Sequence, residues 1–338
     1  MQNGNTITNL NGGTMSITTY REAYKSPEGF EYPYFFAEYQ KALASVWRPQ
    51  EASLESDVRD WHNASPEEKE VVGGILRGFT QLECHVSDYW SNIPTWFPKH
   101  EVAAVARMFS LSEIVHAEAY NLLSDTLGIN EFEAFLGDFI AQTKIGYFLN
   151  EKSVKESLAI FSGAGEGVSL FSSFSVLLSL NLTGRFKGIA QIISWSINDE
   201  QQHSDVGIAL FKELVKEDPL THDEAETIYK GFDAVIENEF AFIKKIFNGR
   251  NLDTVAQEDL RAFICYRAND RLEKLGLRPK YIYKQERANN IKKWFNPLAA
   301  GLTSTDFFAQ SKDGSNYVAK PTQDFMGVNL KTLDLSLV

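Results

Sequence analysis

The chain has 338 residues, of which 43% are hydrophobic and 13% aromatic, enough for a sizeable packed core in one large domain or two smaller ones. Its formal net charge of −12 argues against a general affinity for nucleic acid or for an anionic membrane. Two cysteines, Cys84 and Cys265, provide neither a disulfide framework nor zinc-ribbon spacing, and they fit a reducing, cytoplasmic compartment.

The two ends of the chain lack helical periodicity. Residues 1–20 are rich in Asn, Gly and Thr and have no signal-peptide pattern, so we expect a mobile N-terminal segment. Residues 301–338 are predicted to form a flexible tail. The longest uncharged run lies between Glu166 and Arg185, and its serines, glycines and asparagine indicate a buried core helix rather than a membrane span.

Between these ends the chain shows helical periodicity almost throughout, and strand signals are nearly absent. Ser65, Pro66 and Glu68 form a capping box that begins a long helix, predicted to end before Pro94. The glycines within residues 163–167 weaken regular helix and would permit a π-bulge. We therefore predict an all-α bundle of antiparallel helices. Its expected helices cover residues 65–91, 100–127, 131–148, 154–182, 186–216, 223–247, 258–275 and 281–294.

Two of these helices carry the pattern Glu-x-x-His. Glu113 and His116 lie in "SEIVHAEAY", and Glu200 and His203 lie in "NDEQQH". A spacing of three residues places the carboxylate and the imidazole on one face of a helix. Two such pairs supply half of the ligand set with which helical bundles bind two metal ions, and the other half is one carboxylate from each of two further helices.

Glu83 and Glu166 are the candidates for those two carboxylates. Glu83 lies in the otherwise uncharged stretch "GFTQLECHV", and Glu166 is the only charge in a long apolar stretch. A buried glutamate needs a partner, which a metal cation would provide. Four carboxylates and two imidazoles suit iron or manganese. Tyr120, one turn beyond His116, is a redox candidate if it lies beside a metal pair.

Together these motifs resemble the small, radical-generating subunit of class I ribonucleotide reductase, a ferritin-like dimetal carboxylate family, from about Tyr32 to the C-terminus. The resemblance implies a ferritin-like helical domain at residues 21–300 and a tyrosyl radical at Tyr120. It implies an Fe/Fe, Mn/Fe or Mn/Mn centre. The implied metal ligands are Glu83, Glu113, His116, Glu166, Glu200 and His203. The commonest members have aspartate where this chain has Glu83, whereas some manganese-using branches have glutamate.

The resemblance also implies a path for the radical. The segment "VWRPQE" is similar to the tryptophan-bearing segment of the family, which makes Trp47 a candidate for electron transfer. Asp199 matches the aspartate that links such a tryptophan to a metal-bound histidine. Tyr317, in "GSNYVAKP", resembles the mobile tyrosine that passes the radical to the large subunit, and "TLDLSLV" resembles a docking peptide.

The activity implied is that of a ribonucleoside-diphosphate reductase small subunit, dependent on thioredoxin or glutaredoxin, which lets a large subunit reduce ribonucleotides to deoxyribonucleotides. The expected assembly is a homodimer in the cytoplasm, with an activating flavoprotein as a further candidate partner. Leu170 and Ser196 stand where bulkier apolar groups are expected around Tyr120, so the oxidising equivalent could stay on the metals instead. The alternatives are another dimetal oxidase (desaturase, monooxygenase or ligand-binding oxidase) and a non-enzymatic metal store or scaffold.

Overall fold

The computed structural model describes residues 16–18, 29–129, 153–250 and 252–299. Apart from an isolated bridge between Leu252 and Val255, these residues form helices and the connections between them. The all-α prediction is therefore confirmed. The expected helix at 131–148, most of the N-terminal segment and the whole tail, including Tyr317, lie outside the described residues.

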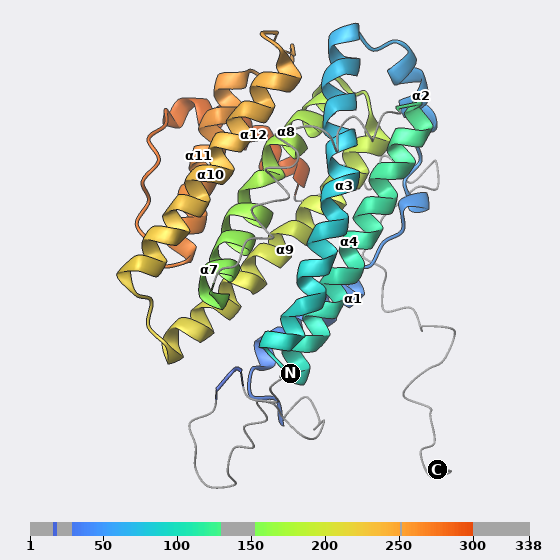
Figure 1. The fold of residues 1–338 in the computed structure, drawn as a ribbon. Coiled ribbons are helices and arrows are strands. Elements are labelled where there is room, and N and C mark those ends of the chain that lie inside the picture. The colour runs from blue at the N-terminus through green and yellow to red at the C-terminus, as the bar shows by residue number, and fades with distance from the viewer. Residues whose placement is uncertain (1–15, 19–28, 130–152, 251, 300–338) are drawn as a thin grey trace, which may run out of the picture.

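The helices lie side by side as one bundle (Figure 1). Two of them, α3 and α4, form a long antiparallel pair, and α9 packs against the apolar segment that runs from α7 to η4. The described elements are α1 (Pro33–Ala44), η2 (Pro49–Glu51), α2 (Glu55–His62), α3 (Pro66–Trp96), α4 (His100–Leu127), α7 (Val154–Leu158), η3 (Ala159–Ser169), α8 (Phe171–Ser179), η4 (Leu180–Thr183), α9 (Lys187–Glu217), α10 (His222–Phe247), α11 (Gln257–Lys274) and α12 (Gln285–Ala299).

The apolar segment Val154–Thr183 lies at the centre of the bundle. By length and composition it could span a membrane, yet the whole of its apolar 18-residue window is buried inside the protein. Within it, η3 is a π-helix of 11 residues whose side chains are all buried, and it contacts α9, α10 and α11. The core-helix prediction and the predicted π-bulge are both confirmed, and the π-helical stretch is longer than a single bulge.

Two glycines of η3 allow the neighbouring helices to approach closely. A Cβ atom on Gly163 would lie 2.8 Å from Cζ of Phe232 on α10, and one on Gly167 would lie 2.7 Å from Cδ of Arg271 on α11. No larger residue fits at either position unless these side chains are displaced. This packing surrounds the turn that carries Glu166.

The start of α9 is held by acidic side chains from α2. Phe186, its N-cap residue, has a positive φ of 54° and provides no side-chain cap. Instead, the Asp57 carboxylate accepts hydrogen bonds from the backbone N–H groups of Gly188 (3.0 Å) and Ile189 (2.8 Å), and Asp60 accepts one from that of Phe186 (2.8 Å). These bonds satisfy N–H groups that a helix start leaves unpaired. They position the helix that carries one Glu-x-x-His pair.

Two helices continue through a proline close to their C-terminal end, and for α3 this proline was expected to lie beyond the helix. The first, α3, passes Pro94 and ends at Trp96, and α12 passes Pro297 and ends at Ala299. A proline removes one backbone hydrogen bond, but close to a helix end the remaining turn can persist when its side chains pack well. Ile93 is fully buried beside Pro94, and Phe295 is buried beside Pro297.

Candidate metal centre

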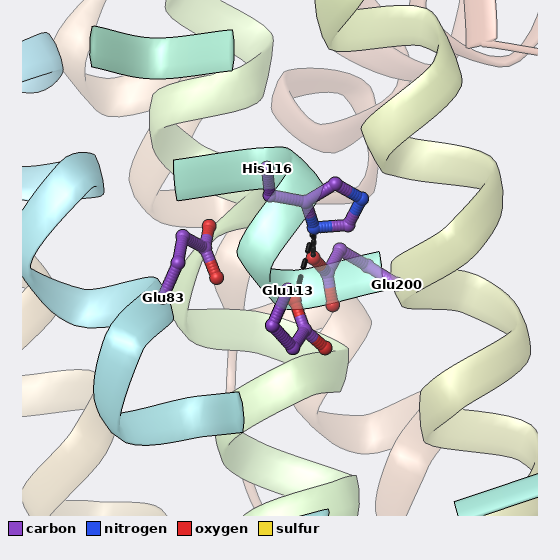
Figure 2. Close-up of side chains that lie close together, drawn as sticks. All are labelled: Glu83, Glu113, His116 and Glu200. Atoms are coloured by element: carbon purple, nitrogen blue, oxygen red, sulfur yellow. Dashed lines mark hydrogen bonds and ion pairs between the residues drawn. The ribbon is translucent and has the colours of Figure 1, made fainter. Parts of the chain in front are cut away.

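Four helical segments bring six predicted side chains to one place in the core. The residues come from α3, α4, η3 and α9, and each is at most 2% exposed. They are Glu83, Glu113, His116, Glu166, Glu200 and His203. Glu83 points from α3 toward the pair from α4 and toward Glu200 on α9 (Figure 2).

The six residues form two overlapping groups of four. In each group the ligand atoms lie within 4.8 Å of one another. Glu113 and Glu200 belong to both groups. Glu83 and His116 complete one group, and Glu166 and His203 complete the other. If two cations were bound, Glu113 and Glu200 could serve both of them, and the remaining side chains would complete the two sites.

Both histidines direct Nδ1 at the shared carboxylates. His116 Nδ1 lies 2.9 Å from Oε2 of Glu113 and 3.0 Å from Oε1 of Glu200. His203 Nδ1 lies 2.7 Å from Oε1 of Glu113 and 3.4 Å from Oε2 of Glu200. Each imidazole therefore aims a nitrogen lone pair or a proton into the space that its group of four encloses.

Several buried oxygens of the cluster lack a polar partner. Both oxygens of Glu83 and Oε2 of Glu166 accept no hydrogen bond from the described side chains or backbone, apart from contacts with neighbouring carboxyl groups. Burying carboxylates without donors or counter-charges is strongly unfavourable. Cations that prefer oxygen and imidazole ligands would remove this cost, so the residues present fit a pair of such ions.

The electrostatics of the cluster favour retained protons when no cation is bound. Burial, followed by the charges of Glu200 and Glu113, raises the pKa of Glu83 well above its ordinary value. Burial and the same two carboxylates also raise the pKa of Glu166. Burial also raises the pKa of Glu200, but hydrogen bonds from Glu166, His116 and other neighbours outweigh it and lower that pKa below its ordinary value. The cluster thus divides into ionised and protonated carboxyl groups.

The surroundings also raise the pKa of both imidazoles. Burial alone lowers the pKa of His116, but hydrogen bonds to Asp199, Glu113 and Glu200 outweigh it and raise the pKa well above 6.5. For His203, the charge and hydrogen bond of Glu113 outweigh burial and raise the pKa to about 9. In the metal-free cluster, protons on these groups supply positive charge that metal ions would otherwise supply. Metal binding would release them, because the imidazole nitrogens and carboxylates must be deprotonated to bind a metal.

Tyr120 lies beside the group that contains Glu83. Its side chain is fully buried, its ring centroid is 6.3 Å from that of His116, and Phe79 packs on it at 4.8 Å. Burial, followed by the charge of Glu83, raises the pKa of the phenol well above 10, and the nearby Ser196 hydroxyl acts in the opposite direction. The phenol is therefore protonated and has a polar neighbour where an apolar one was expected.

A single carboxylate oxygen links Trp47 to the cluster. Oδ2 of Asp199 accepts a hydrogen bond from Nε1 of Trp47 at 2.9 Å and lies 3.2 Å from Nε2 of His116. The ring of Trp47 also stacks on that of His116, with centroids 5.7 Å apart. An imidazole held at its second nitrogen by a carboxylate is the usual support of a histidine metal ligand.

Trp90 was not among the predicted site residues. Its Nε1–H donates a 2.7 Å hydrogen bond to Oε1 of Glu166, and the indole is fully buried. The sequence held a usable signal, because Trp90 follows Glu83 by seven residues and therefore lies on the same face of α3.

Residues 28–290 match the family described as "Ribonucleotide reductase, small chain". The chain belongs to this family. It is 30% identical to a probable ribonucleoside-diphosphate reductase small subunit of Invertebrate iridescent virus 6, over 91% of this chain and 98% of the viral one. The fold is similar to the R2 subunit from Clostridium botulinum (TM-score 0.74, 22% identity, 87% of this chain and 97% of that one). It is also similar to a dimanganese(II) NrdF from Streptococcus sanguinis (TM-score 0.70, 23% identity, 80% and 98%).

The family membership confirms the predicted fold and activity. The chain is a ferritin-like, all-α small subunit of ribonucleoside-diphosphate reductase, an oxidoreductase. Small subunits of this family carry a dimetal carboxylate centre, generate the radical and act together with a large subunit. The comparisons favour this function over the other dimetal oxidases, the metal store and the scaffold.

Proposed function

We propose that the six clustered side chains hold two ions of iron, of manganese or one of each, with Glu113 and Glu200 shared between them. The observation that carries this assignment is that two buried groups of four candidate ligands overlap at these two carboxylates. When bound, a redox-active pair supplies an oxidising equivalent after reaction with oxygen or a reduced oxygen species. Trp90 fixes Glu166, and Asp199 fixes His116, in the orientations that binding needs.

We propose Tyr120 as the residue that stores the radical. Its buried phenol lies beside the cluster, and its raised pKa keeps the proton on the oxygen until an electron is removed. The exclusion of water by Phe79 and the surrounding core supports a long lifetime for such a species. If Ser196 shortens that lifetime, the oxidising equivalent stays on the metal pair instead.

The proposed route to the large subunit runs from His116 through Asp199 to Trp47, and then to Tyr317. Trp47 and Asp199 line a small surface hollow together with apolar side chains that include Leu111. Short contacts join His116 to Asp199 and Asp199 to Trp47, and they support this part of the route. Tyr317 lies outside the described residues.

The proposed organisation has three parts: residues 1–20, the dimetal domain at residues 21–300, and residues 301–338 as the segment that docks on the large subunit. We further propose that the chain works as a homodimer in the cytoplasm. Activation by a flavoprotein belongs to this proposal as well.

Two tyrosine variants test the function. Tyr317→Phe is expected to bind metal and form the oxidised centre normally but to lose turnover with the large subunit, because the last redox-active ring before the interface is gone. Tyr120→Phe is expected to abolish the tyrosyl signal in electron paramagnetic resonance while metal content stays unchanged. Normal turnover of Tyr317→Phe would remove that residue from the route, and a persisting tyrosyl signal would remove Tyr120.

A further inference from the structure

Trp90 contacts the metal-ligand cluster on the side away from Trp47. It donates its indole N–H to Glu166, and its ring lies 5.8 Å from that of His203 in an edge-to-face arrangement. Both neighbours belong to the same group of four ligands, whereas Trp47 stacks on His116 of the other group. The cluster therefore has an indole in contact with each half.

A series of aromatic rings continues from Trp90 along the end of α3. The ring centroid of Tyr89 is 6.1 Å from that of Trp90, and the centroid of Trp96 is 5.8 Å from that of Tyr89. Phe161 of η3 stacks on Tyr89 at 3.5 Å and meets Trp90 at 5.8 Å. Trp96 is only partly buried, whereas the two rings before it are buried. The series therefore leads from the cluster toward the surface.

We propose that Trp90 and Trp96, with the ring of Tyr89 between them, form a second electron path that reduces the oxidised metal pair when it has not passed its oxidising equivalent to the large subunit. The electron donor is a small one-electron reductant in solution, of the ascorbate class. This inference rests on the dimetal function proposed above.

The electron balance of the path is simple. The ascorbate monoanion loses one electron to Trp96 and one proton to the solvent, and so becomes the ascorbyl radical anion. Trp96 passes one electron to Trp90, and Trp90 passes one to the metal pair. Both indoles end in their starting state, and the only bond that breaks is the O–H bond of ascorbate, whose proton enters the solvent. The hydrogen bond to the Glu166 carboxylate stabilises positive charge on Trp90 while it is oxidised.

The surroundings of Tyr89 suit a bridging role. Burial raises the pKa of its phenol above the ordinary value, and Ser157 donates a 3.3 Å hydrogen bond to its oxygen. A phenol that holds its proton resists net oxidation, so the positive charge rests on the indoles. The tyrosine ring serves only as an aromatic bridge between them. Electron tunnelling falls steeply with distance, and the Tyr89 ring, whose centroid is 6.1 Å from that of Trp90 and 5.8 Å from that of Trp96, bridges the single step between the indoles.

The test compares three variants of the full-length, metal-loaded protein without the large subunit. After oxidation, ascorbate is added, and the absorbance and paramagnetic signals of the oxidised centre are followed. Trp96→Phe keeps an aromatic ring against Tyr89 but removes the easily oxidised indole, and it is expected to slow reduction about tenfold or more. Trp61→Phe on α2, whose indole packs under Lys69, is the control and should leave the rate unchanged.

Trp90→Phe is expected to slow reduction as Trp96→Phe does, but it also removes the hydrogen bond to Glu166. Trp96 makes no such contact with the cluster. If Trp90→Phe loses metal, Trp96→Phe alone therefore tests the path. Equal reduction rates in wild type and Trp96→Phe, with equal metal content and equal oxidised centre at the start, would overturn the path alone. A chain that binds no metal pair would overturn the proposed function and the path together, and elemental analysis separates the two results.

Discussion

Individual residues of the cluster couple metal binding to the release of protons. In the metal-free protein, Glu83, Glu166, His116 and His203 all have a pKa above the ordinary value of their side chain. The ordinary values are about 4.3 for glutamate and about 6.5 for histidine. Between pH 5 and pH 9, roughly, the folded state therefore binds more protons than the unfolded state. Stability that depends on these protons is present at low pH and is lost as the pH rises.

We predict that the free energy of unfolding of the metal-free protein falls as the pH is raised through this window. With the folded pKa of His203 at about 9, that residue alone contributes on the order of 3 kcal/mol. Urea denaturation of chelator-treated protein measures the trend. Loading with metal should remove it, because bound cations replace the protons. Glu83→Gln provides the comparison, since it deletes one of the titrating groups and should flatten the curve. Stability that increases with pH in the metal-free protein would contradict this account.

At the scale of elements, the contact between α9 and η3 determines where half of the ligands lie. Ser204 donates a 2.6 Å hydrogen bond to the carbonyl oxygen of Ser162, and a Cβ atom on Gly207 would overlap the side chain of Ser162. The backbone of α9 at Gly207 therefore packs directly against the Ser162 side chain of η3, in the part of the two helices that carries Glu166 and His203. Overpacking at such a position forces backbone shifts.

Gly207→Ala is expected to destabilise the protein by about 1–3 kcal/mol and to weaken metal binding, because α9 must move away from η3. Gly73→Ala on α3 is the matched control, since its Cβ would meet only the mobile end of Arg77, at 3.3 Å, and alanine favours helix. Thermal unfolding and metal titration of both variants measure the effect. An unchanged melting temperature in Gly207→Ala would mean that the two helices are not in close contact there.

Most elements could be predicted from the sequence because their signals are local. The capping box at Ser65 and the left-handed Gly128 mark the start of α3 and the end of α4 as expected. The continuation of α3 through Pro94 could not be predicted, because it depends on the burial of side chains such as Ile93 by distant helices. The capping of α9 by Asp57 is likewise a contact between segments far apart in the chain.

The candidate site could be predicted from the sequence only in part. Each Glu-x-x-His pair is a local pattern, and the isolated charges of Glu83 and Glu166 identified the remaining helices. The structure brings all six residues together, which the metal proposal requires. The spacing from Glu83 could have placed Trp90 on the face of α3 that meets the cluster, but no short-range pattern joins Trp90 to Glu166, 76 positions away, so its hydrogen-bond partner could not be predicted.

For the whole molecule, the central claim is that one buried cluster joins four helical segments around a pair of ions. The surrounding core is apolar and continuous, so the fold is expected to survive loss of the ions. A substitution at Glu200 tests this claim most directly, because Glu200 belongs to both groups of ligands. Glu213, a partly exposed residue on the same helix, provides a control for the change of glutamate to alanine.

The most direct measurement is the metal content per chain of the purified wild type, Glu200→Ala and Glu213→Ala by elemental analysis, with circular dichroism on the same samples. We predict two ions per chain in wild type and Glu213→Ala, and loss of metal in Glu200→Ala with helical content largely retained. Two ions per chain retained in Glu200→Ala would contradict the shared-carboxylate centre.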